Sequence, residues 1–109
     1  MTDTAPPVVH RYLSAADAGN FAALADCFTA DGSVTDEGKT YHGRSEIIAW
    51  REALAGLWTY TSTITANEPI GPDEHRLGVR LEGNFPGGTT ELTYRFALRE
   101  GLIAKLDID

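Results

Sequence analysis

Apolar positions in the first half of the chain recur at the spacing of an α-helix. The first such stretch follows Pro6 and Pro7 and ends at Gly19. Its apolar residues fall at i, i+3, i+4 and i+7, the pattern of one buried helical face; they are Val9, Tyr12, Leu13 and Ala16. Proline is tolerated in the first turn of a helix and glycine often ends one, so both boundaries agree with the periodicity.

The same spacing predicts two further helices. The second follows Asn20, whose side chain can accept a hydrogen bond from the first turn, and its apolar positions are Phe21, Leu24, Ala25 and Phe28. The third follows Gly43, with Ser45 as its N-cap and Gly56 as its end. Along it lie Ile47, Ile48, Trp50, Arg51 and Leu54.

Two short strands are predicted between the second and third helices, over residues 33–36 and 39–42 around Gly38. The second half of the chain then changes to an alternation of apolar and polar residues with a period of two, which is typical of strands. It predicts long strands over residues 58–66, 75–85, 90–98 and 102–108.

The last two strands allow their register to be predicted. Arg99, Glu100 and Gly101 suit a three-residue hairpin loop with glycine in the left-handed conformation. This loop pairs Leu98 with Leu102, Phe96 with Ala104, Tyr94 with Leu106 and Leu92 with Ile108. The register puts all these apolar residues on one face, whereas a slip by one residue would scatter them.

Helices followed by a meander of long strands predict a single α+β domain over residues 1–109, with the helices packed on one face of the sheet. The chain has 9 basic and 16 acidic residues and a net charge of −7, which disfavours nucleic acid and anionic membranes as partners. Cys27 is the single cysteine, so no disulfide is expected within the chain. We find no pattern of a signal peptide or a membrane span and expect a cytoplasmic protein.

Three short stretches carry a resemblance to known proteins. They are Phe-Thr-Ala-Asp-Gly-Ser-Val at 28–34, Gly-Arg-Ser-Glu-Ile-Ile at 43–48, and Gly-Leu-Ile at 101–103. Together with the order of elements, they resemble the NTF2-like superfamily and, within it, the SnoaL-like and ketosteroid-isomerase-like branches. The resemblance implies a cystatin-like cone, in which three N-terminal helices pack on a curved, mostly antiparallel sheet and enclose a pocket. It also implies a homodimer.

Residues 11–21 further resemble the opening of the ketosteroid isomerases. In those enzymes the tyrosine that matches Tyr12 donates a hydrogen bond to a dienolate oxygen, and the aspartate that matches Asp36 carries the proton. The resemblance implies the same two roles here. Those enzymes have a second donor, an aspartic acid just before an aromatic-Arg-Phe sequence. Here that sequence is residues 94–96, and the matching position is Leu92.

This pair of residues suggests a reaction. A carboxylate can remove a proton next to a carbonyl while a hydrogen-bond donor stabilises the oxyanion that forms. Asp36 is the candidate base and Tyr12 the candidate donor, and His42 could relay a proton or orient Asp36. Five further residues are expected to line the pocket and bind the ligand, namely Trp50, Trp58, Tyr60, Leu92 and Tyr94. The sequence has no HxH or HExxH motif, so we expect neither a metal nor an organic cofactor.

Each catalytic candidate also has a simpler interpretation. Tyr12 can be an ordinary core aromatic, Asp36 a turn residue, and His42 a solvated histidine at a strand end. Two functions therefore stay open. One is a cofactor-free isomerase, cyclase or lyase that transfers a proton on a small apolar carbonyl compound, and the other is a non-catalytic small-ligand-binding or dimerisation module. The polar face of the sheet, where Arg95 is predicted opposite Lys105, favours a homodimer interface.

Overall fold

The computed structural model describes residues 5–109, and in them the chain forms three helices and a six-stranded sheet. The helices are α1 (Pro7–Ala18), α2 (Phe21–Asp26) and α3 (Gly43–Ala55). The strands are β1 (Phe28–Asp36), β2 (Lys39–His42), β3 (Tyr60–Gly71), β4 (Glu74–Gly83), β5 (Thr89–Arg99) and β6 (Leu102–Ile108). Their order across the sheet is β2-β1-β6-β5-β4-β3.

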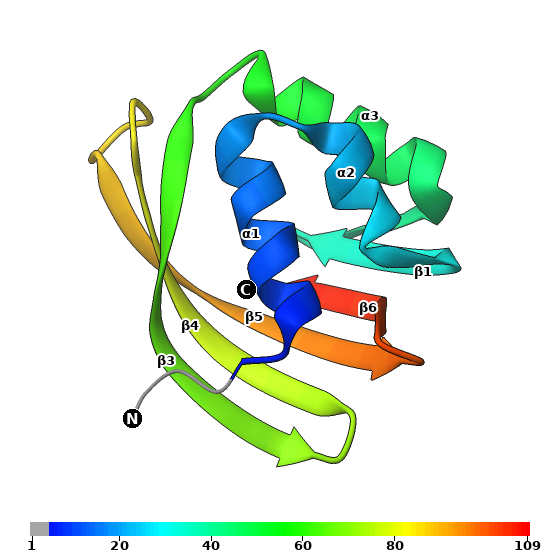
Figure 1. Ribbon diagram of the computed structural model, residues 1–109. Coiled ribbons are helices and arrows are strands. Elements are labelled where there is room, and N and C mark those ends of the chain that lie inside the picture. Colours follow the sequence, from blue (N-terminus) through cyan, green and yellow to red (C-terminus); the bar gives the residue numbers. More distant parts are fainter. Residues whose placement is uncertain (1–4) are drawn as a thin grey trace.

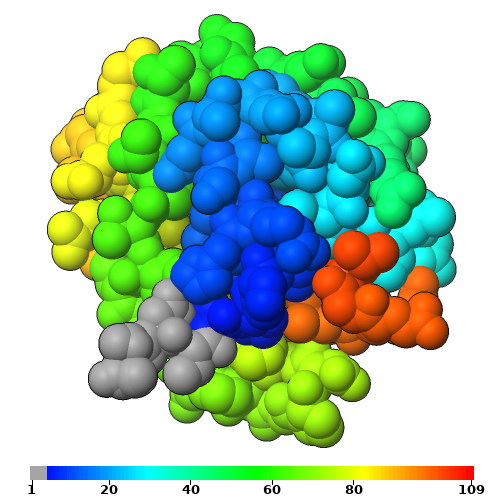
Figure 2. Space-filling view, in the orientation of Figure 1, coloured from blue at the N-terminus to red at the C-terminus, as the bar shows by residue number. Residues whose placement is uncertain are grey.

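The sheet curves around the helices. Figure 1 shows the long strands β3, β4 and β5 bending past α1, with α2 and α3 gathered near β1. In the space-filling view, α1 and α2 cover the middle of the concave face (Figure 2). All neighbouring strands are antiparallel except β1 and β6, which run parallel. The predicted α+β cone with helices on one face of a mostly antiparallel sheet is therefore confirmed.

The core lies between the helices and the concave face, because alternate residues of the strands meet the apolar stripes of the helices. Its largest fully buried side chains are Tyr12, Phe28, Phe96, Leu24, Ile47, Leu77, Ile103 and Leu106. Arg44 ties the start of α3 to β1, since its Nη2 donates to the Phe28 carbonyl at 2.7 Å.

The first two helices keep most of their predicted boundaries. Gly19 ends α1 in the left-handed conformation, with φ of 72°, and the side-chain Oδ1 of Asn20 accepts from the Ala23 N–H at 3.1 Å. The prediction that Phe28 lies on the second helix is wrong, because α2 ends at Asp26 and Phe28 begins β1. A buried phenylalanine fits the periodicity of a helix as well as that of a strand. In the structure, Phe28 pairs with Ile103 of β6 and so belongs to the strand.

Ser45 is not the N-cap of α3. The helix begins at Gly43, and His42 occupies the cap position without a side-chain hydrogen bond of its own. The Glu46 carboxylate accepts from the His42 N–H at 2.8 Å instead. The helix start is thus held by an acidic residue in its first turn, where a negative charge also suits the helix dipole.

The predicted register of the last hairpin is wrong by up to two residues. Glu100 and Gly101 both have positive φ, 53° and 79°, which makes a two-residue turn with Arg99 opposite Leu102. An irregularity after Ala97 then shifts the pairing, so that the aromatic residues of β5 lie opposite different partners: Phe96 opposite Leu106 and Tyr94 opposite Ile108. A shift of two residues preserves the face on which each side chain lies, so the apolar pattern did not reveal the error.

Candidate functional site

Asp36 is the last residue of β1 and lies half-buried where the strand meets α3. The indole Nε1 of Trp50, on α3, donates a hydrogen bond to its Oδ2 at 3.2 Å. Burial raises the pKa of the Asp36 carboxyl above its ordinary value of 3.8, and the negative charge of Glu37 adds to that effect. The Trp50 hydrogen bond and the positive charge of Arg51 oppose it without cancelling it. Asp36 is therefore a carboxylate that holds its proton more tightly than an exposed aspartate does.

A cavity of about 380 Å³ opens between the β1–β2 hairpin and α3, and Asp36 and Trp50 both line it. We call it the mouth cavity. Tyr41 and Leu54 add apolar wall, and the ring of Tyr41 lies 5.9 Å from that of Trp50. Leu57 stands at its rim with 65% of its side chain exposed. The mouth cavity therefore combines apolar surface with one carboxylate of altered pKa, a combination found at many ligand sites.

Tyr12 and Tyr94 lie deeper, between α1 and the sheet. Tyr12 is 2% exposed, and its ring meets those of Phe28 and Phe96 edge to face, each at 5.9 Å. Burial raises the pKa of both tyrosines, and the negative charge of Asp36 is a further cause in each case. Neither Tyr12 nor Tyr94 is among the residues that line the mouth cavity.

Arg51 of α3 is the functional candidate that the sequence analysis missed. It is only 6% exposed, and its guanidinium lies against three aromatic rings, 5.2 Å from Phe21, 5.5 Å from Trp50 and 5.1 Å from Tyr60. Its Nη1 donates to the Tyr60 hydroxyl, whereas its Nε is buried without a hydrogen-bond partner. The sequence feature that could have identified it is the presence of an arginine within the apolar stripe of the predicted third helix.

Of the remaining predicted ligand residues, Tyr60 and Leu92 pack against the core from the sheet side. Tyr60 begins β3 and packs edge to face on Phe85 at 6.3 Å, whereas Trp58 precedes the strand and is partly buried. Gly83 lies opposite Tyr60, and a Cβ there would be 2.1 Å from the Thr59 carbonyl oxygen, so this close approach requires glycine. Leu92 is partly buried and pairs with Val79.

His42 lies apart from the other candidates. It is exposed and pairs with Ser33, whereas Asp36 pairs with Lys39 at the turn end of the same hairpin. Successive residues of a strand are about 3.3 Å apart, so His42 is about 10 Å along the strand from Asp36. The structure does not bring the His42 side chain to the Asp36 carboxylate.

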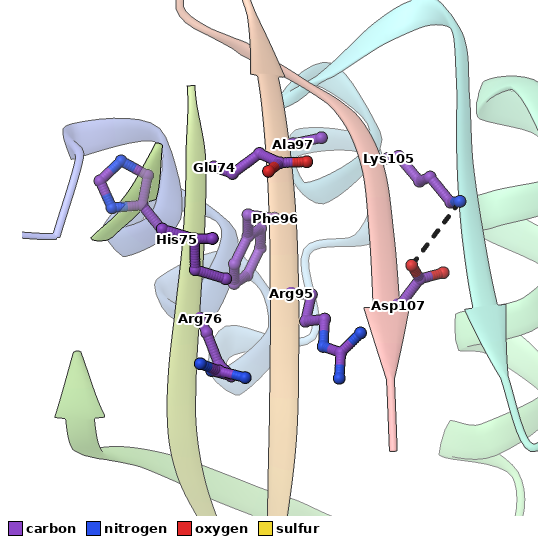
Figure 3. Close-up of a pocket in the computed structure, with 9 residues that line it drawn as sticks. Glu74, His75, Arg76, Arg95, Phe96, Ala97, Lys105 and Asp107 are labelled. Carbon is purple, nitrogen blue, oxygen red and sulfur yellow. Dashed lines mark ion pairs between the residues drawn. The ribbon is translucent and has the colours of Figure 1, made fainter. Parts of the chain in front are cut away.

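A second cavity, of about 370 Å³, lies on the opposite face of the sheet. Figure 3 shows its charged side chains, which extend from three neighbouring strands and include Arg76, Arg95, Lys105 and Asp107. Lys105 and Asp107 form an ion pair at 3.7 Å. Arg95 pairs with Asp107 across the strands and not with Lys105, which corrects the predicted register on this face as well.

Among residues 5–109, no three or more His, Cys, Asp and Glu side chains gather in a way that could hold a metal ion. None of the helices in the described part of the chain is long and apolar enough to cross a membrane.

Comparisons with known proteins place this geometry in a family. Residues 7–101 match the sequence profile of the SnoaL-like domain. No curated protein sequence matches the chain significantly. Among solved structures, a candidate polyketide cyclase from Sinorhizobium meliloti is 30% identical and superposes with a TM-score of 0.90, over 96% of this chain and 95% of that one.

Two other solved structures share the fold at lower identity. A protein with a ketosteroid isomerase-like fold from Catenulispora acidiphila, solved with trimethylamine, is 23% identical with a TM-score of 0.86, over 97% of this chain and 86% of that one. A Δ5-3-ketosteroid isomerase from a Mycobacterium species is 19% identical with a TM-score of 0.78, over 94% and 88% of the two chains. The fold implied by the sequence resemblance is confirmed.

Proposed function

Because the chain belongs to the SnoaL-like family, we propose that it is a small enzyme of the isomerase, cyclase or lyase kind. It transfers a proton on an apolar carbonyl compound and needs no metal or organic cofactor. One observation carries the proposal. Asp36 is a half-buried carboxylate with a raised pKa, held by the Trp50 indole on the wall of the mouth cavity.

The mechanism follows from the chemistry of these groups. The Asp36 carboxylate removes a proton from the carbon next to the carbonyl, and the electron pair of the broken C–H bond moves onto the carbonyl oxygen. Tyr12, whose buried hydroxyl keeps its proton, donates a hydrogen bond to that oxygen. Protonated Asp36 then returns the proton to another atom of the substrate. A raised pKa makes Asp36 a stronger base than a solvated aspartate. His42 has no role in this proposal.

The residues that line the mouth cavity and the similar solved structures both support an apolar carbonyl compound as the substrate. Trp50, Tyr41 and Leu54 offer aromatic and aliphatic surface to an apolar ligand. The compared structures include a candidate polyketide cyclase and a ketosteroid isomerase, and both names refer to carbonyl compounds. We infer that the substrate is small, mostly apolar, and carries an acidic C–H next to a carbonyl.

Exchange of carbon-bound hydrogen for deuterium tests the proposal without knowledge of the natural substrate. A panel of cyclic enones and 1,3-diketones is incubated with the protein in D2O, and loss of the α-proton signal is followed by NMR. Asp36→Asn is expected to slow the catalysed exchange about 10²- to 10⁴-fold. Glu37→Gln, which removes the neighbouring carboxylate in the turn, is the matched control and should retain exchange. Catalysed exchange that survives Asp36→Asn excludes Asp36 as the base.

A non-catalytic small-ligand-binding module is the second candidate, and Leu92 favours it. This residue stands where the ketosteroid isomerases have their second donor, and it offers no hydrogen bond. The packing of Tyr12 against Phe28 and Phe96 also fills much of the interior with the protein's own aromatic rings. This function would be supported if the panel compounds bound saturably while their hydrogen–deuterium exchange stayed at the rate in buffer.

We also propose that the charged outer face of the sheet is a homodimer interface. Arg80 and Glu91 form an ion pair at 3.6 Å, and Arg95 lies opposite Asp107 in the strand register. The face therefore carries both signs of charge, which suits a self-complementary two-fold contact. Sedimentation equilibrium should give twice the mass of one chain. Arg95→Glu should halve that mass, whereas Arg11→Glu on α1 should leave it unchanged. A wild-type protein that sediments as a single chain contradicts the proposal.

A further inference from the structure

Arg51 is a buried cation that lacks an anionic partner. Its side chain is 6% exposed, and among residues 5–109 no carboxylate forms an ion pair with it. Buried charged groups are costly to desolvate, and in most proteins each is paired with an opposite charge. The guanidinium stays protonated at any physiological pH, so the cost cannot be avoided by loss of the proton.

The contacts of Arg51 compensate this cost only in part. The rings of Phe21, Trp50 and Tyr60 lie 5.1–5.5 Å from its Cζ, within the range of cation–π attraction. One Nη1 donor binds the Tyr60 hydroxyl, but the buried Nε has no partner. Of the five N–H donors of a guanidinium, the one on Nε is thus buried and unused.

The position of Arg51 connects it to the mouth cavity. It is adjacent in the chain to Trp50, whose ring lies 5.5 Å from its guanidinium, and the same indole lines the mouth cavity and holds Asp36. The positive charge of Arg51 also acts on Asp36 and on Tyr12. Arg51 itself does not line the mouth cavity, and the contact that links the two is the ring of Trp50.

We propose that Arg51 binds a negatively charged oxygen of the ligand. It does so through the planar donors of its guanidinium, which fit carboxylate and enolate oxygens. In the proposed reaction this oxygen is the one that gains charge when Asp36 removes the proton, so Arg51 supplies the second donor that Leu92 cannot. The inference rests on the proposed function only for the location of the ligand.

A pair of probes that differ only in charge tests the inference without turnover. Binding of 2-naphthoate and of its neutral isostere 2-naphthamide is measured by isothermal titration calorimetry. Wild-type protein is expected to bind naphthoate at least about tenfold more tightly, because a charged hydrogen bond out of water is stronger than a neutral one. Arg51→Met should remove this preference, and Arg51→Lys should keep part of it because the charge remains.

Controls separate this inference from the effects of net charge and from the proposed reaction. Arg11→Met removes the same charge from the exposed side of α1 and should leave the preference intact. Asp36→Asn should preserve or increase it, although it stops exchange. A protein that binds naphthoate with preference but catalyses no exchange would refute the proposed function and retain this inference.

A second measurement follows Arg51 in the wild-type protein itself. The Nε–H resonance of Arg51 is assigned by its loss in Arg51→Lys and followed in wild-type protein by proton–nitrogen NMR. Naphthoate should shift it, and naphthamide should shift it less. Equal affinities for the two probes, a preference that survives in folded Arg51→Met, or no binding of either probe at millimolar concentration would each overturn the inference.

Discussion

The indole of Trp50 is in direct contact with the carboxylate that we propose as the base. Its N–H donates to Asp36 Oδ2 at 3.2 Å, and protonation of Asp36 would weaken this charged hydrogen bond. Because burial raises the pKa of Asp36, the change should occur above the ordinary value of 3.8. Trp50 is therefore a built-in reporter for the charge of Asp36.

We predict that the fluorescence of Trp50 titrates with Asp36. The chain has two tryptophans, so Trp58→Phe leaves Trp50 as the single emitter. Its emission should change with a midpoint above pH 3.8, and exchange activity should fall with the same midpoint as the pH is lowered, since only the ionised carboxylate is a base. The combined variant Trp58→Phe, Asp36→Asn should lose the transition. A transition that remains would belong to another group, and the link between indole and carboxylate would be refuted.

Arg51 should reduce the stability of the fold, if its unpaired charge serves a ligand. Arg51→Met keeps an unbranched chain of similar length and removes the buried charge. We expect the free energy of unfolding to rise by about 1 to 3 kcal/mol, measured by urea denaturation at neutral pH. The exposed control, Arg11→Met on α1, should change it by no more than about 0.5 kcal/mol. A destabilised Arg51→Met protein would show that the arginine supports the fold.

At this scale the sequence predicts some functional residues better than others. Resemblance pointed to Tyr12 and Asp36, and the structure buries Tyr12 in the core and places Asp36 on the wall of the mouth cavity. Helical spacing put Arg51 on the stripe of α3, but a long side chain there can also extend to solvent. Rings of Phe21 and Tyr60, from distant parts of the chain, close over the guanidinium, and no local pattern encodes that.

Two hairpins of this protein turn at a glutamate followed by a glycine. Glu37 and Glu100 both have φ of 53°, and Gly38 and Gly101 follow with φ of 76° and 79°. Positive φ is unfavourable for glutamate but is tolerated by asparagine, which is common at the first position of such two-residue turns. Each turn thus contains one residue that fits its conformation and one that does not.

Replacing Glu100 by asparagine should therefore stabilise the β5–β6 hairpin. We expect a gain of about 0.4 to 1 kcal/mol in the free energy of unfolding, measured by thermal denaturation. Glu100→Gln, which removes the same charge without the preference for positive φ, should have less than half this effect. If both variants gained equally, charge and not backbone conformation would be the cause.

The β5–β6 turn shows why the helices and strands could be predicted from the sequence but the strand register could not. The elements themselves were predicted, because their apolar periods are long and regular. The register was wrong because residues 99–101 fit a three-residue loop as well as residues 100–101 fit a two-residue turn. The irregularity after Ala97 then added a second shift that no residue type marks.

The whole sheet consists of two parts that β6 joins. On one side is the β1–β2 hairpin, which lies under α3, and on the other is the meander of β3, β4 and β5. Leu106 is fully buried in β6, opposite Phe96 of β5 and Val34 of β1. Its side chain therefore packs where the two parts meet.

Leu106→Ala should destabilise both parts together. We expect a loss of about 2 to 5 kcal/mol in the free energy of unfolding, with tryptophan fluorescence and far-ultraviolet circular dichroism changing at the same urea concentration. Leu102→Ala, at the partly exposed start of β6, should cost less. Two separate transitions in the Leu106 variant would show that the parts unfold independently.

At the scale of the molecule, the fold class followed from helices first and strands afterwards, and the family resemblance supplied its shape. The parallel pairing of β1 with β6 could not be derived from pattern, because nothing in residues 28–36 specifies a partner found some 70 residues later. Local signals encode hairpins well, whereas distant pairings depend on the packing of the assembled core.

The position of β6 between β1 and β5 affects when the sheet can form during synthesis of this protein. During translation β1 and β5 emerge with exposed hydrogen-bonding edges that stay open until residues 102–108 have left the ribosome. The nascent chain can form its hairpins early, but the two parts of its sheet join only once β6 can pair with both. Chaperones that shield strand edges should accordingly matter most to this protein before β6 is available.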